Sequence, residues 1–335
     1  MTNRERIVNT LNFKPVDRLP VIEIMPWWDK TITRWEAEGL VKTKYPHHDI
    51  GAYWGLDDHR QFWIISRDLE LREFVMPDTK GFIKTEEDYE RILPYLYPED
   101  AVMGNWIEDE LHAVKSAHDA GDIAVWFTLD GYFWWPRMLF GIELHLYSFY
   151  EEPELYQRIC KDLLGYHLRV IEEICSVIKP DFMTIAEDMS YNNGPMISRK
   201  MFDTFIRPHY EVLVPALKKH NIKVIVDTDG DCEMLIPWLT DTGVDGILPI
   251  ECQSGSDVNI LREKYPDLVM IGGFNKTVMK NGEAAMRKEF ERIAPAMKTG
   301  GFIPSVDHQT PPDVSMENYK IYRKLQDEFC VEYHP

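Results

Sequence analysis

Three carboxylates lie within five residues in the stretch KVIVDTDGD at 223–231. The apolar run 224–226 is typical of a buried strand, and Asp227, Asp229 and Asp231 follow it directly. Alternate residues of an extended chain point to the same side, so Asp227 and Asp229 could converge on one cation or one proton. The sequence leaves a second interpretation open, in which the pair forms an Asx turn before Gly230.

Polar residues also follow the other predicted strands, which we place at 19–25, 61–66, 123–129, 182–186, 223–226, 246–250, 268–271 and 302–305. The polar residues at these strand ends are Glu23, Asp130, Glu187, Asp188, Asp227, Asp229, Glu251, Asn275, Lys276, Asp307 and His308. One aspartate after a strand is commonly a helix cap or a turn residue, so the inference rests on the pattern across the strands. Asp227, Asp229, Glu251 and His308 are the predicted catalytic residues. For His308 the alternative is a ring that ties its loop to the backbone.

The chain has ten tryptophans, and several stand in clusters close to predicted strand ends. The clusters are PWW at 26–28, YW at 53–54 and YFWWPR at 132–137. We predict that the substrate is bound by Trp27, Trp28, Trp134, Arg137 and Asn275. Aromatic walls suit an aromatic or a methylated cationic ligand, because quaternary ammonium groups bind within aromatic cages. Packing of loops is the alternative role of the tryptophans.

Segments with strand and helix character alternate along the chain, which predicts an α/β fold with a parallel sheet and crossover helices. Helical patterns cover 105–120, 153–178, 198–220, 231–243, 256–266 and 284–300. About seven or eight such units without a linker or repeat favour a single (β/α)8 TIM barrel, one domain over residues 1–335, rather than a doubly wound sheet. We also predict a helix at the N-terminus and an extra segment, residues 26–100, over the barrel mouth.

A formal net charge of −19 and five cysteines without C-x-x-C spacing narrow the function classes. Nucleic acids and anionic membranes are bound by clustered lysines and arginines, so we expect a small-molecule ligand and neither of these partners. The scattered cysteines argue against a disulfide framework and a thiolate zinc site. We find no apolar run of about 18 residues and no signal peptide, which predicts a cytoplasmic protein. A monomer and a homodimer both stay open.

Five segments resemble, in the same order, the uroporphyrinogen decarboxylase superfamily. They are RERIVNTLNFKPVDRLPV at 4–21, GPMISRKMFDTFIRPHYEVLVPALKKH at 194–220, GVDGILPIE at 243–251, IGGFNK at 271–276 and GGFIPSVDHQTPPDVSMENYKIY at 300–322. The superfamily contains uroporphyrinogen decarboxylases and corrinoid-dependent methyltransferases, both (β/α)8 barrels. The resemblance therefore implies the same barrel fold for this chain.

The motifs that decarboxylases use to hold their substrate are missing. Where decarboxylases carry W-M-R-Q-A-G-R-Y, whose arginines grip substrate carboxylates, this chain has IEIMPWWDKTITRW at 22–35, with neither of those arginines. Their active-site tyrosine falls near Arg137, and only His308 matches the superfamily's histidine near the last strand. A mouth rich in carboxylates would also repel a substrate that bears many of them, at about 1–4 kcal/mol for each like-charge pair near 4 Å.

The methyltransferases of the superfamily bind zinc through a His-x-Cys pair and a later cysteine, and the resemblance places Asp227, Asp229 and His308 at these positions. Glu187 is a fourth candidate ligand. Carboxylate and imidazole groups can hold a divalent metal, of which zinc is the first choice. The resemblance thus implies a methyltransferase that moves a methyl group between a small methylated compound and a corrinoid protein. The corrinoid would be bound by that partner protein and not by this chain.

Two alternatives remain from the sequence. One is a uroporphyrinogen decarboxylase-like carboxy-lyase of tetrapyrrole metabolism. The other is a non-catalytic barrel that binds a tetrapyrrole or another small ligand. Arginines at the mouth would favour the carboxy-lyase, and an acidic cluster closed to water would favour the binding protein.

Overall fold

The computed structural model describes residues 1–25, 27–42, 46–68 and 81–335. Within these ranges, seven strands form one curled parallel sheet in the order β1-β2-β3-β6-β7-β8-β9. They are β1 His59–Ile64, β2 Ala124–Asp130, β3 Phe182–Ala186, β6 Lys223–Asp227, β7 Gly246–Ile250, β8 Val269–Phe274 and β9 Phe302–Val306. A small hairpin, β4 Ser190–Tyr191 and β5 Gly194–Pro195, follows β3. The order agrees with the predicted succession of strands.

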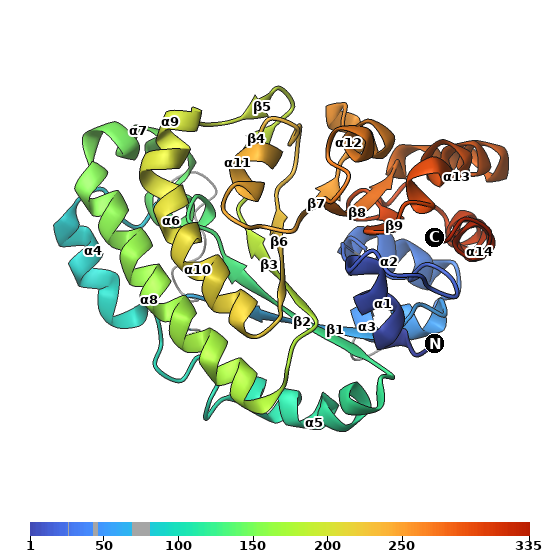
Figure 1. Ribbon diagram of the computed structural model, residues 1–335, viewed down its shortest axis with the longest axis horizontal. Helices are drawn as coiled ribbons and strands as arrows, with labels where there is room; N and C mark the ends of the chain where they lie inside the picture. Colours follow the sequence, from blue (N-terminus) through green and yellow to red (C-terminus); the bar gives the residue numbers. More distant parts are fainter. Residues whose placement is uncertain (26, 43–45, 69–80) are drawn as a thin grey trace.

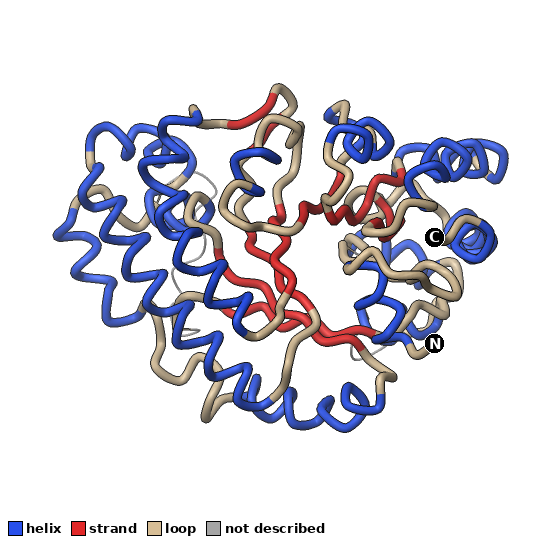
Figure 2. The backbone as a smooth tube through the Cα atoms, viewed as in Figure 1, coloured by secondary structure: helices blue, strands red, loops and turns tan. Residues whose placement is uncertain are grey.

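The described helices lie around this sheet, most of them on its outer side (Figure 2). They are α1 Asn3–Leu11, α2 Asp29–Ala37, α3 Pro46–Tyr53, α4 Glu86–Ile92, α5 Trp106–Ala120, α6 Trp134–Phe140, α7 Ile142–Glu151, α8 Pro153–Val177, α9 Arg199–Met201, α10 Arg207–Lys219, α11 Ile236–Thr240, α12 Val258–Lys264, α13 Glu283–Met297 and α14 Met316–Glu332, as labelled in Figure 1. Short turns are η2 Leu93–Tyr95, η3 Phe202–Ile206, η4 Cys252–Ser254 and η5 Lys276–Asn281. The predicted N-terminal helix is confirmed as α1. None of the described helices combines the length and the apolar character needed to cross a lipid bilayer.

Two apolar layers hold the sheet in place, because its strands are buried on both faces. Inside the curl, Trp126, Phe182, Ile225, Leu248, Ile271 and Ile303 belong to one cluster, which also includes Ile22, Ile24 and, from α1, Ile7 and Leu11. On the outer side, alternate residues such as Phe127, Ile185 and Val226 join the larger core beneath the helices. Helix α1 therefore packs against the inner cluster.

The first predicted strand, 19–25, is not a strand in the described structure. Its Glu23 carboxylate accepts hydrogen bonds from Ser305 Oγ at 3.0 Å and from the Val306 N–H at 3.1 Å, both in β9. On the other side, the Val21 carbonyl accepts from the Asp57 N–H at 2.8 Å, just before β1. Proline has no N–H for a ladder, so Pro20 disfavours regular pairing here. The segment thus links β9 to the chain before β1 through isolated hydrogen bonds and not through a regular ladder. The fold is TIM-barrel-like, with seven described strands in the main sheet.

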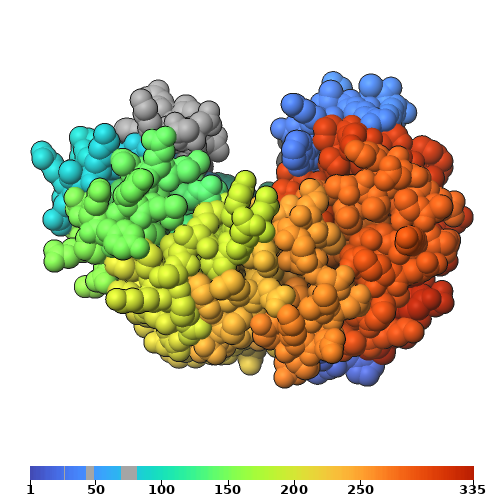
Figure 3. All heavy atoms as spheres, turned by 90° about the horizontal axis from the view of Figure 1, so that it is seen from above, coloured from blue at the N-terminus to red at the C-terminus, as the bar shows by residue number. Residues whose placement is uncertain are grey.

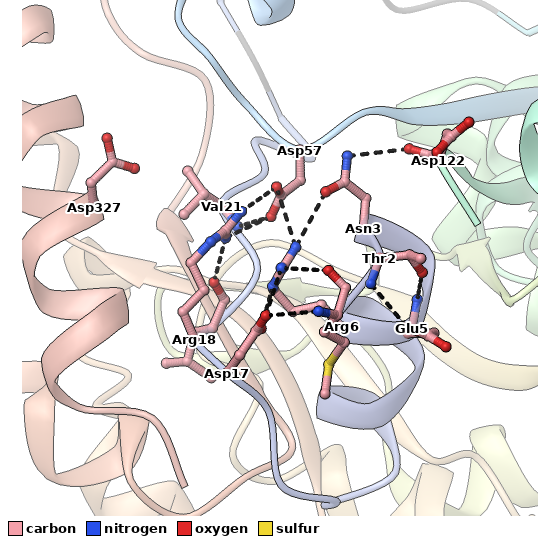
Figure 4. A network of polar contacts seen from close by, with 12 residues as sticks. Thr2, Asn3, Glu5, Arg6, Asp17, Arg18, Val21, Asp57, Asp122 and Asp327 are labelled. Carbon is pink, nitrogen blue, oxygen red and sulfur yellow. Dashed lines mark hydrogen bonds and ion pairs between the residues drawn. The ribbon is translucent and has the colours of Figure 1, made fainter. Parts of the chain in front are cut away.

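Ion pairs of the buried residues Arg6 and Asp57 tie this segment to α1 and to the approach to β1 (Figure 4). Asp57 binds Arg18 with both carboxylate oxygens and also accepts from the Val21 N–H at 3.0 Å. Arg6 of α1 lies 3.7 Å from the same carboxylate and 2.8 Å from Asp17. Because charges are rarely buried without partners, this network fixes where residues 17–21 cross the base of the sheet.

The predicted extra segment 26–100 is only partly correct. Its residues 59–64 are β1, which pairs with β2 in parallel register and belongs to the main sheet. Helix α2 packs beside the loop after β9, where Thr31 Oγ1 donates to the Thr310 carbonyl at 2.8 Å and Trp35 Nε1 donates to the Val314 carbonyl at 3.0 Å. Residues 69–80 lie outside the described residues. The assignment of residues 1–335 to one domain stays a prediction.

Candidate active site

Asp227 is the last residue of β6, and Asp229 follows it at the predicted spacing of two residues. Between them, Thr228 is fully buried, and its Oγ1 accepts hydrogen bonds from the N–H groups of Met189 at 3.0 Å and Ser190 at 3.2 Å. Thr228 is thereby held against the chain that follows β3. An extended backbone then turns both carboxylates to the opposite side.

The structure brings Asp229 and His308 together from β6 and β9. His308 Nε2 lies 3.5 Å from Asp229 Oδ2, and the two side chains are 24% and 42% exposed. Asp227 is more buried, and burial, followed by the charges of Asp229 and Asp188, raises the pKa of its carboxyl well above the usual range. Asp227, Asp229 and His308 form the acidic group, which is open to water at Asp229 and His308, while burial and the neighbouring carboxylates oppose the charge on Asp227.

Asp188 adds a third carboxylate to this group and links it to two predicted substrate-binding residues. Its Oδ2 accepts a hydrogen bond from Arg137 Nη1 at 2.8 Å, and the Arg137 guanidinium lies 5.2 Å from the ring centre of Trp134. Asp188 has φ of +42°, a left-handed conformation that is rare for a residue with a Cβ. Burial raises the pKa of Asp188, with Asp229 adding to the rise and Arg137 opposing it. Asp188 therefore combines a strained backbone with a charged side chain that is paired with Arg137.

Glu187 faces away from this group, into the protein interior. Its fully buried carboxylate accepts hydrogen bonds from the N–H groups of Tyr132, Phe133 and Trp134 at 2.9, 2.6 and 3.4 Å and from the Tyr210 hydroxyl at 2.8 Å. Gly131 makes this approach possible, because a Cβ there would lie 2.3 Å from the Glu187 carboxyl carbon. Burial outweighs these donors and raises the pKa of Glu187 to about 7. The Glu187 carboxylate thus holds the start of α6 in place. Its surroundings do not fit the predicted role of Glu187 as a metal ligand.

The predicted excess of negative charge at the mouth is reduced by local partners. Glu251 lies 2.9 Å from Lys276 Nζ and accepts from the Gly230 N–H at 3.2 Å. Asp307 is fully buried and accepts from the N–H groups of Cys252 and Lys276, each at 3.0 Å. The repulsion expected for an anionic substrate therefore comes mainly from Asp227 and Asp229, not from every strand end.

The other predicted substrate-binding residues, Asn275, Trp27 and Trp28, have their contacts outside the acidic group. Asn275 Oδ1 accepts from the Thr277 N–H at 2.9 Å and caps η5. Trp27 is 1% exposed and packs against Trp35, with ring centres 6.0 Å apart. Trp28 is 43% exposed at the N-terminus of α2. Of the predicted binding residues, Trp134 and Arg137 are therefore the ones that adjoin the acidic group.

The donor set for a metal is incomplete. In the part of the chain that the structure describes, no group of three His, Cys, Asp or Glu side chains is arranged to hold a metal ion. Asp229 and His308 approach each other, but Glu187 is already occupied by four hydrogen-bond donors. The residues present thus do not fit a four-ligand site, and the divalent metal stays a prediction.

Two residues on the inner side of β1 were missed by the sequence analysis. Gln61 Nε2 donates to Thr128 Oγ1 at 2.8 Å, and Thr128 Oγ1 lies 2.7 Å from Thr184 Oγ1 on the next strand. Trp63, two residues along from Gln61, is 42% exposed. The period-two pattern of HRQFWI, with Phe62 and Ile64 apolar, was the available signal for an inward polar face.

A hollow divides the upper face of the molecule (Figure 3). Residues coloured green lie on one side of it, and residues coloured blue and red lie on the other, so segments far apart in the chain form its two walls. The hairpin β4–β5 and α11 stand on this face (Figure 1). The loops that carry Asp188, Asp229 and His308 follow the carboxyl ends of β3, β6 and β9, where α/β barrels place their active sites.

Comparison with known proteins identifies the family. A methyltransferase from Methanosarcina mazei has a similar solved structure, with a TM-score of 0.68 and 14% identity over 98% of this chain and 99% of that chain. Fpglu1 from Fervidobacterium pennivoraus reaches a TM-score of 0.44 and 11% identity over 84% of this chain and 82% of that chain. Such low identities show the fold alone, and curated protein sequences give no match. The uroporphyrinogen decarboxylase family model matches residues 127–329, more than half of the chain, and this chain therefore belongs to the uroporphyrinogen decarboxylase family.

Proposed function

We propose that this protein is a methyltransferase that moves a methyl group between a small methylated compound and a corrinoid protein. The contact between Asp229 and His308, 3.5 Å apart and open to water, is the observation that supports it most. It offers a proton donor and its orienting carboxylate at the end of the sheet where barrel enzymes react. The proposal includes a closed (β/α)8 barrel, in which residues 19–25 take the place of the first strand.

The chain's own residues have a defined part in such a reaction. His308, oriented by Asp229, donates a proton to the methylated heteroatom while the bond between that atom and the methyl carbon breaks. A reduced corrinoid on the partner protein would supply the nucleophile that accepts the methyl group. Asp227 and Asp188 place two further carboxyl groups beside this pair. General acid catalysis of this kind contributes about 10²-fold to 10⁴-fold.

Methyl transfer to free cob(I)alamin from a panel of methylated compounds tests the proposal, with the change in corrin absorbance as the readout. His308→Gln should reduce the rate by about 100-fold or more. The matched control is His112→Gln, because His112 lies on α5 with its side chain 59% exposed and takes no part in the acidic group. Equal rates for the two variants, or no transfer from any donor, would contradict the proposal.

The carboxy-lyase alternative can be tested on the same preparation. Two cations beside the acidic group are paired, Arg137 with Asp188 at 2.8 Å and Lys276 with Glu251 at 2.9 Å, which does not favour an anionic tetrapyrrole. Release of carbon dioxide from uroporphyrinogen would establish the lyase instead. Elemental analysis of protein purified without chelator examines the predicted metal separately.

A further inference from the structure

A cavity of about 540 Å³ lies between the segment before α2, the residues after α3 and the inner side of β1. Its apolar wall includes Ile24, Met25, Trp27 and Trp63, and its polar wall includes Gln61 and Gln309. Gln309 follows His308 in the chain, so this cavity adjoins the residue to which we assign proton donation. A volume of this size is typical of a small-molecule site.

The charges around this cavity are balanced, unlike those of the acidic group. Asp57 is neutralised by Arg18, and Arg60 lies 3.2 Å from Asp58. Burial lowers the pKa of His59 to about 4, so its imidazole is neutral near pH 7. The Glu23 carboxyl is directed toward Tyr322, whose hydroxyl donates to it at 2.8 Å. Because the acidic residues Asp57 and Asp58 are already paired with arginines, the described wall of this cavity favours an uncharged ligand over a charged one.

The shape and the hydrogen-bonding groups of the cavity favour a flat ligand. The Trp63 indole is 42% exposed, which leaves a large apolar surface available. Gln61 is held by its bond to Thr128 at 2.8 Å. Aromatic rings pack well against an indole, and carboxamides both donate and accept hydrogen bonds.

We infer that this cavity binds the body of the substrate and that this body is an uncharged aromatic ring with a hydrogen-bonding substituent. The inference rests on the proposed function for its link to His308, and it selects an aromatic ligand over a methylated cation. The ring lies against Trp63, its substituent bonds to Gln61 or Gln309, and the group that reacts extends past Gln309 toward His308.

Calorimetric titration with three matched probes tests this site without any methyl transfer. Benzamide is neutral, benzoate is an anion and benzylammonium is a cation, while all three share the same ring. Benzamide should bind most tightly. Trp63→Ala should weaken benzamide binding by about tenfold, and Gln61→Leu by about threefold to tenfold. Trp106→Ala is the control, because Trp106 is 55% exposed on α5 and does not line this cavity.

Several outcomes would overturn the inference. Tighter binding of benzylammonium or of benzoate would show that charge, not the neutral wall, selects the ligand. Unchanged binding in Trp63→Ala, or an equal loss in Trp106→Ala, would place the ligand elsewhere. Far-UV circular dichroism and the Tm of each variant exclude misfolding as the cause. Because the readout is binding, a failure of methyl transfer leaves this result interpretable, and a failure here leaves the methyltransferase proposal standing.

Discussion

At the scale of single residues, Asp227 and Asp229 set the character of the site. Their carboxylates repel each other, and burial raises the pKa of Asp227 well above its usual range. No backbone N–H is among the causes that act on the Asp227 carboxyl, as an Asx turn would require. Because such groups stabilise little, we predict that they serve a ligand or a proton rather than the fold.

The double variant Asp227→Asn and Asp229→Asn should keep the fold and raise its stability by about 1 kcal/mol, because two like charges are removed. For a chain of this size that is a rise in Tm of about 2 °C. Methyl transfer should fall by about 100-fold or more, and any stabilisation by added Zn²⁺ should disappear. Differential scanning calorimetry and the cob(I)alamin assay measure these effects. A fall in Tm of several degrees would instead identify the pair as a structural turn.

Asp188 allows its backbone strain to be separated from its ion pair with Arg137. Asp188→Ala and Asp188→Gly both remove the carboxylate, but only glycine adopts φ of +42° without a steric penalty. Urea unfolding should therefore show the alanine variant to be less stable than the glycine variant by about 1 kcal/mol. Equal urea midpoints for the two variants would mean that residue 188 leaves the left-handed conformation once the ion pair with Arg137 is lost.

At the scale of elements, Glu187 connects the end of β3 to the start of α6. Burial raises the pKa of Glu187 to about 7 from 4.5, so the folded protein retains a proton that the unfolded chain releases within this window. Stability should therefore fall as pH rises from 4.5 to 7 and level off above pH 7, by an amount on the order of 3 kcal/mol. Burial acts on Glu23 in the same direction and also raises its pKa to about 7.

Urea unfolding at a series of pH values measures this slope. Glu187→Gln cannot ionise and should reduce the slope to the part that comes from Glu23, while costing about 1–3 kcal/mol at low pH because its NH₂ group meets the N–H donors of α6. Glu143→Gln, an exposed substitution on α7, serves as the control and should leave the slope as it is. A slope that Glu187→Gln does not change would show that Glu187 is ionised throughout.

At the scale of the whole molecule, residues 19–25 lie between β9 and β1, the two edge strands of the curled sheet. Their links to β9 and to the chain before β1 run through Glu23 and Asp57 rather than through a regular ladder. Because amides outside a ladder open more readily, hydrogen exchange of residues 21–25 should be about tenfold or more faster than that of β2 and β3. Mass spectrometry of peptic fragments can compare them. Equal protection would establish a regular eighth strand.

The sequence by itself determined the succession of elements and the placement of polar residues at strand ends. Nearly continuous apolar runs predicted strands at 182–186 and 246–250 with the bounds that the structure has, since buried parallel strands are apolar on both faces. The family motifs indicated the family. Both conclusions depend on local sequence, because periodicity and short motifs are properties of contiguous residues.

Only the tertiary structure decided which of these polar residues lie together. Asp229 meets His308, whereas Glu187 turns inward to the start of α6 and Glu251 pairs with Lys276. The inward face of β1, with Gln61 and Trp63, also became clear only when β1 was placed beside β2. The physical reason is that a carboxylate's partners and its burial are set by chains that meet in space from distant positions, and these long-range contacts leave no periodic signal in the sequence.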